Sequence, residues 1–226
     1  MEKETLVIKS TEKLSEVFKD SSNNSTTERR PKGYVEIYER TNDGVDKQLV
    51  GKCNLVVLQG RELIGQSLTG VTNDNTRTKA DEKIYWFGLG TGGVSSGDPF
   101  SPNPPLSTDT DLTNEVPFGI DSTNCTDLVA GKYYKHNLDK VEFEIDGENE
   151  DAYLITKITI NIGIEDVQHS PEYLISEAGL FTCSNNTPGQ ARDLPYSQYH
   201  MFARITFPSI VKTNTRELVF LWYIYT

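Results

Sequence analysis

The sequence lacks clustered basic residues and long apolar runs. Its 22 lysines and arginines are dispersed among 33 acidic residues, which gives 226 residues a net charge of −11. Binding to a nucleic-acid backbone needs clustered Lys and Arg, so the charge pattern argues against nucleic acid as the main partner. No apolar run approaches bilayer-spanning length, and the first residues have no signal-peptide core. We expect a soluble chain, made in the cytoplasm, with no membrane partner.

Paired cysteines and local catalytic motifs are missing as well. Cys53, Cys125 and Cys183 lie far apart and form no CxxC motif, which is typical of thiols in a reducing compartment, although a disulfide between two of them stays open. The three histidines show no metal-ligand spacing, and neither a nucleophile elbow nor an HExxH motif is present. These absences favour a protein that is not an enzyme and needs no cofactor.

Glycine and proline are concentrated in residues 85–112, which read YWFGLGTGGVSSGDPFSPNPPLSTDTDL. Gly88, Gly90 and Gly93 match the spacing of a dinucleotide-binding loop, but that motif requires a helix after the third glycine. Four prolines within seven residues exclude a helix there. We therefore predict a rigid extended loop at 88–112 that packs across its own domain or a neighbouring subunit. The residues expected to make this packing are Trp86, Phe87, Pro102, Pro104 and Pro105.

Alternation of apolar and polar residues predicts a mainly β protein. Residues 153–164 show the clearest period of two, and an acidic turn at 146–151 separates them from a shorter strand at 141–145. Further strands are expected at 34–39, 47–57, 84–89, 173–182, 199–207 and 218–225, and one short helix at 59–68. This spacing predicts an antiparallel β-sandwich or jelly-roll-like domain over residues 32–226.

Residues 1–31 form a separate N-terminal arm in this scheme. They include a polar, low-complexity tract at 20–27 and cannot bury enough apolar surface to make a domain. Two interpretations remain. The arm is a partly disordered tail, or it becomes ordered by docking on a neighbouring subunit.

Acidic residues at the end of the Gly/Pro loop could hold a hard cation. Asp109 and Asp111 stand one residue apart, and calcium takes several oxygen ligands from loops of this kind. The stretch lacks the glycine and the terminal glutamate of an EF-hand. The favoured interpretation is that these side chains hydrogen-bond to the loop backbone, so no metal site is assigned.

One carboxylate lies inside an apolar run, in the stretch ISEAGLF. An enzyme would use a buried Glu177 as a general base. The structural alternative places a bulge or a close backbone approach at Ala178 and Gly179 and pairs Glu177 with a basic side chain. Arg204 is the expected partner, because an unpaired charge in a core is costly. The ion pair is the favoured interpretation.

Four blocks of sequence resemble a family of virion structural proteins of tailed bacteriophages. In order they are WFGLGTGG with DPFSPNPPLSTDTDL, ISEAGLF, MFARITFPSIVKT and LVFLWYIYT, within about residues 34–226. The resemblance implies a neck, collar, tail or baseplate component that is located in the virion and contacts other virion proteins. It implies no catalytic residue. Repeated copies on a symmetric particle would make it a homo-oligomer.

Two alternatives stay open. The first is a head decoration or fibre-attachment protein. The second is a carbohydrate-binding or carbohydrate-active β-sandwich, which needs paired carboxylates in a cleft lined by aromatic residues. Tyr85 and Trp86, together with Asp109 and Asp111, are the candidates for such a cleft.

Overall fold

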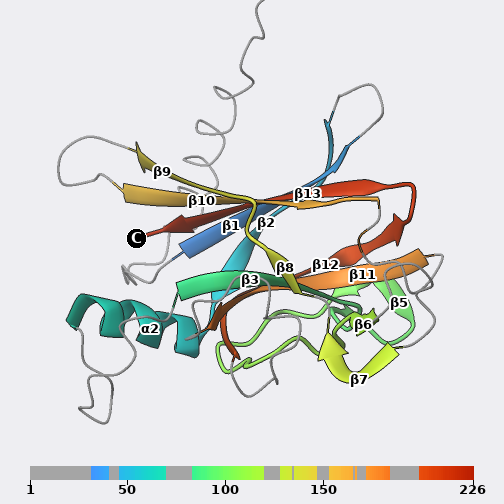
Figure 1. Ribbon diagram of the computed structural model, residues 1–226, viewed down its shortest axis with the longest axis horizontal. Coiled ribbons are helices and arrows are strands. Elements are labelled where there is room, and N and C mark those ends of the chain that lie inside the picture. The colour runs from blue at the N-terminus through green and yellow to red at the C-terminus, as the bar shows by residue number, and fades with distance from the viewer. Residues whose placement is uncertain are drawn as a thin grey trace, which may run out of the picture. The chain divides into compact units, whose positions relative to one another are not determined.

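The computed structural model describes residues 32–40, 46–69, 83–119, 128–133, 135–146, 153–164, 166, 172–183 and 199–226 (Figure 1). The chain divides into two compact units, residues 1–30 and 31–226. The predicted N-terminal arm, Cys125 and most of the acidic turn at 146–151 lie outside the described residues.

Nine strands form one antiparallel sheet, in the order β8-β3-β11-β12-β2-β1-β13-β10-β9. Their bounds are β1 Lys32–Arg40, β2 Asp46–Val56, β3 Lys83–Gly90, β8 Lys135–Asn137, β9 Lys140–Asp146, β10 Tyr153–Ile162, β11 Glu172–Cys183, β12 Tyr199–Thr213 and β13 Glu217–Tyr225. Two small antiparallel pairs accompany the sheet, β4 Val94–Ser95 with β5 Asp98–Pro102 and β6 Pro117–Gly119 with β7 Leu128–Tyr133. The helix α2 spans Leu58–Thr69.

The sheet curls until its two ends face each other. β8 and β9 stand at opposite ends of the strand order, yet only two residues of chain separate them. Across the space between the layers, the ring centroid of Phe87 on β3 lies 4.7 Å from Phe220 and 6.5 Å from Trp222, both on β13. The result is the sandwich-like, mainly β fold that the sequence predicts, made by one folded sheet (Figure 1).

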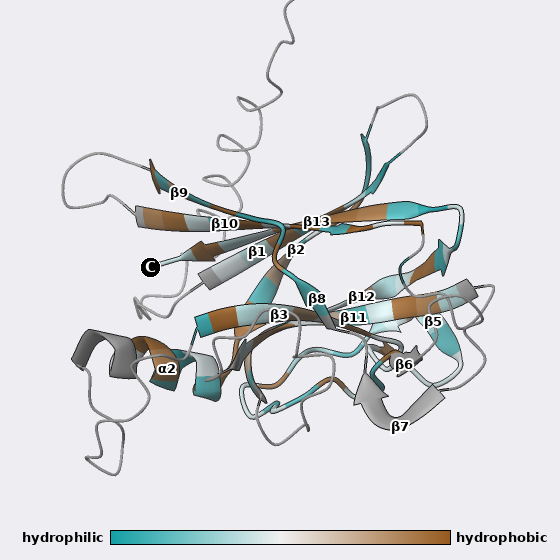
Figure 2. Cartoon of the chain, in the orientation of Figure 1, coloured by the Kyte–Doolittle hydropathy of each residue, from teal (hydrophilic) through white to brown (hydrophobic). Residues whose placement is uncertain are grey.

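The alternation in the sequence decides which side chains enter this core. Ile158 and Ile160 on β10 are buried, as are Val35 and Ile37 on β1. Figure 2 shows apolar and polar residues following one another along β10. Because successive strand residues point to opposite faces, one set of side chains faces the opposite layer and the other faces outward. The predicted pairing of 141–145 with 153–164 is present, with Val141 opposite Ile158.

The helix begins one residue earlier and ends one residue later than predicted. It follows β2 directly, and Val57 N donates a hydrogen bond of 3.1 Å to Phe202 O on β12. A Cβ on Gly60 would overlap the same carbonyl oxygen, so the helix lies against β12 as closely as backbone allows. Leu63 carries this contact into the core. Within the described residues, no helix is long and apolar enough to cross a bilayer.

The Gly/Pro segment is more ordered than an extended loop. Residues 94–102 make the β4–β5 hairpin, with Gly97 at its turn at φ 88°. Only a glycine adopts this left-handed backbone without strain. The alternation rules that located the long strands did not predict strands of two and five residues, because so few positions show no clear period.

Candidate functional site

The Gly/Pro segment crosses the outer face of β11 and β12. On β12, Ile205 and Phe207 point into the core, so Arg204 and Thr206, which alternate with them, point outward. On β11, Glu177 and Gly179 face outward beside them, since Gly179 is the direct cross-strand neighbour of Arg204 and Glu177 that of Thr206. Glu177 and Arg204 are therefore diagonal neighbours on one face.

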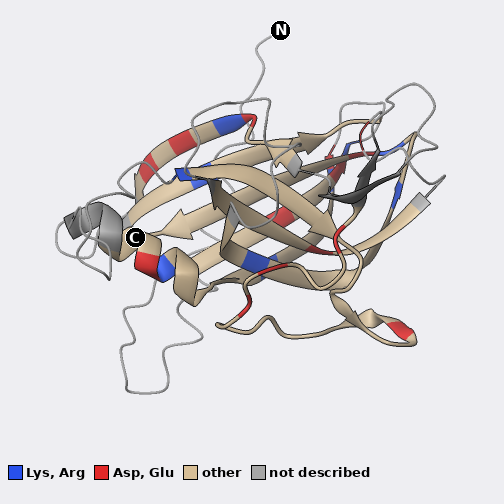
Figure 3. Ribbon diagram, turned by 60° about the horizontal axis from the view of Figure 1, so that its bottom comes forward, with Lys and Arg blue, Asp and Glu red and all other residues tan. Residues whose placement is uncertain are grey.

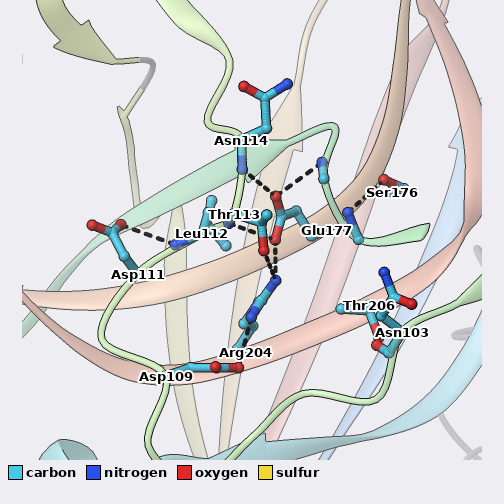
Figure 4. A network of polar contacts seen from close by, with 12 residues as sticks. Asn103, Asp109, Asp111, Leu112, Thr113, Asn114, Ser176, Glu177, Arg204 and Thr206 are labelled. Carbon is cyan, nitrogen blue, oxygen red and sulfur yellow. Dashed lines mark hydrogen bonds and ion pairs between the residues drawn. The ribbon is translucent and has the colours of Figure 1, made fainter. Parts of the chain in front are cut away.

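The carboxylate of Glu177 is the centre of a polar network (Figure 4). Its side chain is fully buried. Oε1 accepts hydrogen bonds from the backbone N of Gly92 at 3.0 Å and of Asn114 at 2.9 Å. Oε2 accepts from Thr113 N at 3.1 Å and from Arg204 Nη2 at 2.5 Å. Three amides and one guanidinium compensate the buried charge. A buried carboxylate without such partners would strongly destabilise the fold.

Arg204 links this carboxylate to the second half of the loop. Its Nη2 also donates to Thr113 Oγ1 at 2.7 Å, and its Nη1 donates to Asp109 Oδ2 at 2.6 Å. Asp109 Oδ2 accepts a further bond of 2.8 Å from Leu106 N. The ion pair expected between Glu177 and Arg204 is thus present, and Asp109 is a second acidic partner of the same guanidinium.

The close contact between the start of the loop and β11 requires glycine. A Cβ on Gly93 would overlap Ser176 O, and a Cβ on Gly90 would lie 2.5 Å from Glu177 Oε1. Only residues without a side chain let the loop backbone reach β11 and direct the amide of Gly92 at the carboxylate. The glycine-rich run that resembles a phosphate-binding loop therefore holds an anion of its own chain.

A second set of hydrogen bonds fixes the β4–β5 hairpin on the same face. Gly93 N donates to Ser176 Oγ at 2.9 Å, and Asn103 N donates to Gly93 O at 2.9 Å. Thr206 Oγ1 donates to Asn103 O at 2.5 Å, and Ser95 Oγ bonds the Asn103 side chain at 2.9 Å. The loop is consequently bound to both β11 and β12, before and after its turn.

The two aromatic residues expected to anchor the loop have different roles. Phe87 lies in the main core between the layers. Trp86 is 3% exposed and belongs to a smaller apolar cluster on the outer face. The cluster comprises Trp86, Val57, Leu112, Phe181 and Met201. Because Leu112 ends the Gly/Pro loop, Trp86 fixes the loop to its own domain.

The prolines and the apolar residues beside them form the outer surface of the loop. Pro104 is exposed, and Pro102 and Pro105 are partly buried. Phe100 is 75% exposed and Leu106 is 61% exposed. These exposed apolar side chains stand on a backbone whose position the buried network fixes.

Asp109 and Asp111, the two possible cation ligands, both bind groups of their own chain. Asp109 pairs with Arg204, and Asp111 Oδ1 accepts a bond of 2.9 Å from Leu112 N. The bond from Leu106 N to Asp109 is the side-chain-to-loop contact that the sequence favours. In the part of the chain that the structure describes, no three His, Cys, Asp or Glu side chains form a metal-binding group.

The register irregularities of the β11–β12 pairing flank Ala178 and Gly179, where the sequence indicates a bulge or a close backbone approach. The register shifts between Ile175 and Glu177 and again between Leu180 and Phe181. At both shifts the extra residues belong to β12. Residues 207–209 lie opposite Ser176, and Phe202 is inserted between the partners of Leu180 and Phe181. The close contacts at Gly179 are with side chains and not with backbone, since a Cβ there would meet Phe181 and Leu112 at 3.0 and 3.3 Å.

Sequence reasoning found Glu177 and Arg204 but not the other members of the network. The sequence points to Asp109 as a loop-backbone acceptor, a cation ligand or a carbohydrate-site carboxylate, and it gives no sign of Thr113 or of the amides of Gly92 and Asn114. Backbone donors carry no residue-specific signal. The sequence offers one signal for a second carboxylate. A guanidinium has several N–H donors, so one arginine can bind more than one acidic side chain.

A second polar group lies on the outward side of β1 and β13. Tyr223 OH donates a bond of 3.2 Å to Glu36 Oε2, and Glu36 is 8% exposed. Burial, together with the charge of Glu36, raises the pKa of Tyr223 and of Tyr38 above the usual value of 10.0. The neutral phenols thus donate to the carboxylate.

We found no match to this chain among protein-family models, curated proteins or solved structures.

Proposed function

We propose that this protein is a structural component of a tailed-phage virion that binds other virion proteins at the neck, tail or baseplate as repeated copies. The observation that carries the proposal is a loop with exposed Phe100 and Leu106 fastened to the sheet by buried charges. A pre-fixed loop loses little entropy on docking, and exposed apolar side chains are the groups that protein interfaces bury.

The sequence blocks that carry the phage resemblance are the ones that build the loop network. Gly92 and Asp109 come from the first block, Glu177 from the second and Arg204 from the third. The fourth block is β13, which supplies Phe220 and Trp222 to the core. The resemblance therefore concerns the loop and its support, and these residues have structural roles.

The carbohydrate alternative loses two of the four residues on which it depended. Trp86 is buried beneath Leu112, so no open ring face is available there for a sugar. The carboxylate of Asp109 is paired with Arg204. The proposal assigns no catalytic residue.

Location in the particle is the decisive measurement. Antibodies raised against the purified protein should label intact virions of the phage that encodes it, at the neck, tail or baseplate. Label on the capsid surface would favour head decoration, and label on fibres would favour fibre attachment. Absence from purified virions by mass spectrometry would refute a structural role.

A pair of variants tests the loop surface within this role. We expect Phe100→Asp to abolish incorporation into particles when it replaces the wild-type chain. Ser96→Asp is the matched control, because Ser96 is exposed on the same hairpin and receives the same charge. Equal incorporation of both variants would contradict the role of the loop, whatever the label shows.

A further inference from the structure

The last strand of the sheet carries an apolar stripe that is not covered. β9 ends the strand order, and no described strand pairs with its other edge. Val141, Phe143 and Ile145 on β9 are 44, 69 and 76% exposed, and Leu154 beside them on β10 is 43% exposed. Val141 pairs directly with Ile158, which is buried, so the stripe continues the core face beyond the covered part.

The other face of β9 is charged, with one lysine followed by two glutamates. Lys140, Glu142 and Glu144 follow one another on that face. Figure 3 shows blue and red stretches of ribbon where charged residues lie on the strands. Lys140 Nζ lies 2.7 Å from Glu142 Oε1, and Lys157 on β10 stands directly opposite Glu142. The β9–β10 pairing is regular, without a bulge. Such a straight edge is open to another strand.

We propose that β9 pairs antiparallel with β9 of a second copy of this chain, with Glu142 on the two-fold axis. This register places Lys140 opposite Glu144 of the second copy, twice by symmetry. It also places Val141 opposite Phe143 on the apolar face, again twice. An isologous interface needs this self-complementarity, and cross-strand pairs of opposite charge or of apolar residues stabilise it.

The central pair of Glu142 side chains is a like-charge contact that opposes pairing, and neighbouring cations offset its repulsion. Each is flanked by its own Lys140 and Lys157, so four cations surround two carboxylates. Moving the register by one residue would place charged side chains against the apolar stripe. Moving it by two, with Phe143 on the axis, would place Glu142 opposite Glu144. With Val141 on the axis, Lys140 would meet Glu142, but Phe143 would lie opposite Asp139. The chosen register therefore combines two Lys–Glu pairs with two apolar pairs.

The first test is the oligomeric state of the full chain, measured by sedimentation over a concentration series. We expect a reversible dimer and a monomer for Phe143→Lys. We expect Lys140→Glu to weaken the dimer roughly tenfold, and Lys140→Glu with Glu144→Lys to restore it, because each reversed charge again meets its opposite. Residues 140 and 144 of one strand are too far apart to touch, so rescue reports contact between copies. A wild-type monomer at all concentrations overturns the proposal, as does a dimer that Phe143→Lys leaves intact.

A crosslink tests the register without disrupting the interface. Glu142→Cys should give a disulfide-linked dimer under mild oxidation, and Phe143→Cys should give less, with the wild-type chain reporting any background from native cysteines. More dimer from Phe143→Cys would overturn the register. These results are independent of the virion proposal, because β9 lies away from Phe100 and its loop.

Discussion

Arg204 Nη2 lies 2.5 Å from Glu177 Oε2, across two neighbouring strands and under the Gly/Pro loop. We predict that Arg204→Met lowers the free energy of unfolding by roughly 3–5 kcal/mol, because it leaves a fully buried carboxylate without its counter-charge. Urea unfolding of the full chain measures the loss. The double variant with Glu177→Gln should lose less than the sum of the single losses, and strict additivity would contradict the coupling.

Gly93 is the position where the loop backbone meets β11. Gly93→Ala should cost roughly 1–3 kcal/mol, since the new methyl group overlaps Ser176 O and the loop must shift. Gly65→Ala in α2 is the control, because a Cβ there meets nothing within 4 Å and alanine favours the helix. Thermal unfolding should therefore separate the two variants in opposite directions. Equal changes in Tm for the two variants would contradict the close contact between Gly93 and Ser176 O.

Asp109 is expected to act as a partner of Arg204 and not as a calcium ligand. Asp109→Asn should lower stability by about 1.5–3 kcal/mol, the range for a hydrogen bond to a charged group. Calcium in millimolar excess should leave the Tm of the wild-type chain unchanged. A rise in Tm with calcium that Asp109→Asn removes would instead establish a cation site.

The raised pKa of Tyr223 predicts that the protein loses stability at alkaline pH. Burial raises its pKa above 10.0, so the folded state holds the phenolic proton more tightly than the unfolded state does. The resulting stability is complete below pH 10 and is lost as the pH rises above it. Tyr223→Phe should be less stable than wild type at pH 7 by about 0.5–1.5 kcal/mol, having lost a hydrogen bond to Glu36. The gap should narrow above pH 10 in urea titrations, and a constant gap would contradict the linkage.

Two phenylalanines distinguish the core from the proposed docking surface. Phe87 is fully buried between the layers, whereas Phe100 is 75% exposed. Phe87→Ala should cost about 3–5 kcal/mol, and Phe100→Ala should change stability by no more than about 0.5 kcal/mol. Guanidinium unfolding checks both. A large loss for Phe100→Ala would mean that its ring supports the fold rather than a partner.

Much of the fold could be predicted from the sequence, for a definite reason. On β10, apolar side chains recur every second residue at Ile158, Ile160 and Ile162, and this period identifies both the strand and its buried face. The β4–β5 hairpin could not be predicted in this way. Its position depends on hydrogen bonds from Gly93 to Ser176 and from Thr206 to Asn103, which join residues 83 and 103 positions apart in the chain.

The sequence by itself determined a β-rich domain, the rejection of a nucleotide site and the pairing of Glu177 with Arg204. Local patterns suffice for these three conclusions. A period of two identifies strands, prolines exclude a helix, and a charge inside an apolar run requires a partner of opposite charge. Only the tertiary structure decided what the glycines do. The sheet must curl, and β11 and β12 must lie side by side, before the amides of Gly92, Thr113 and Asn114 can converge on one carboxylate. Contacts between such distant segments leave no local pattern in the sequence.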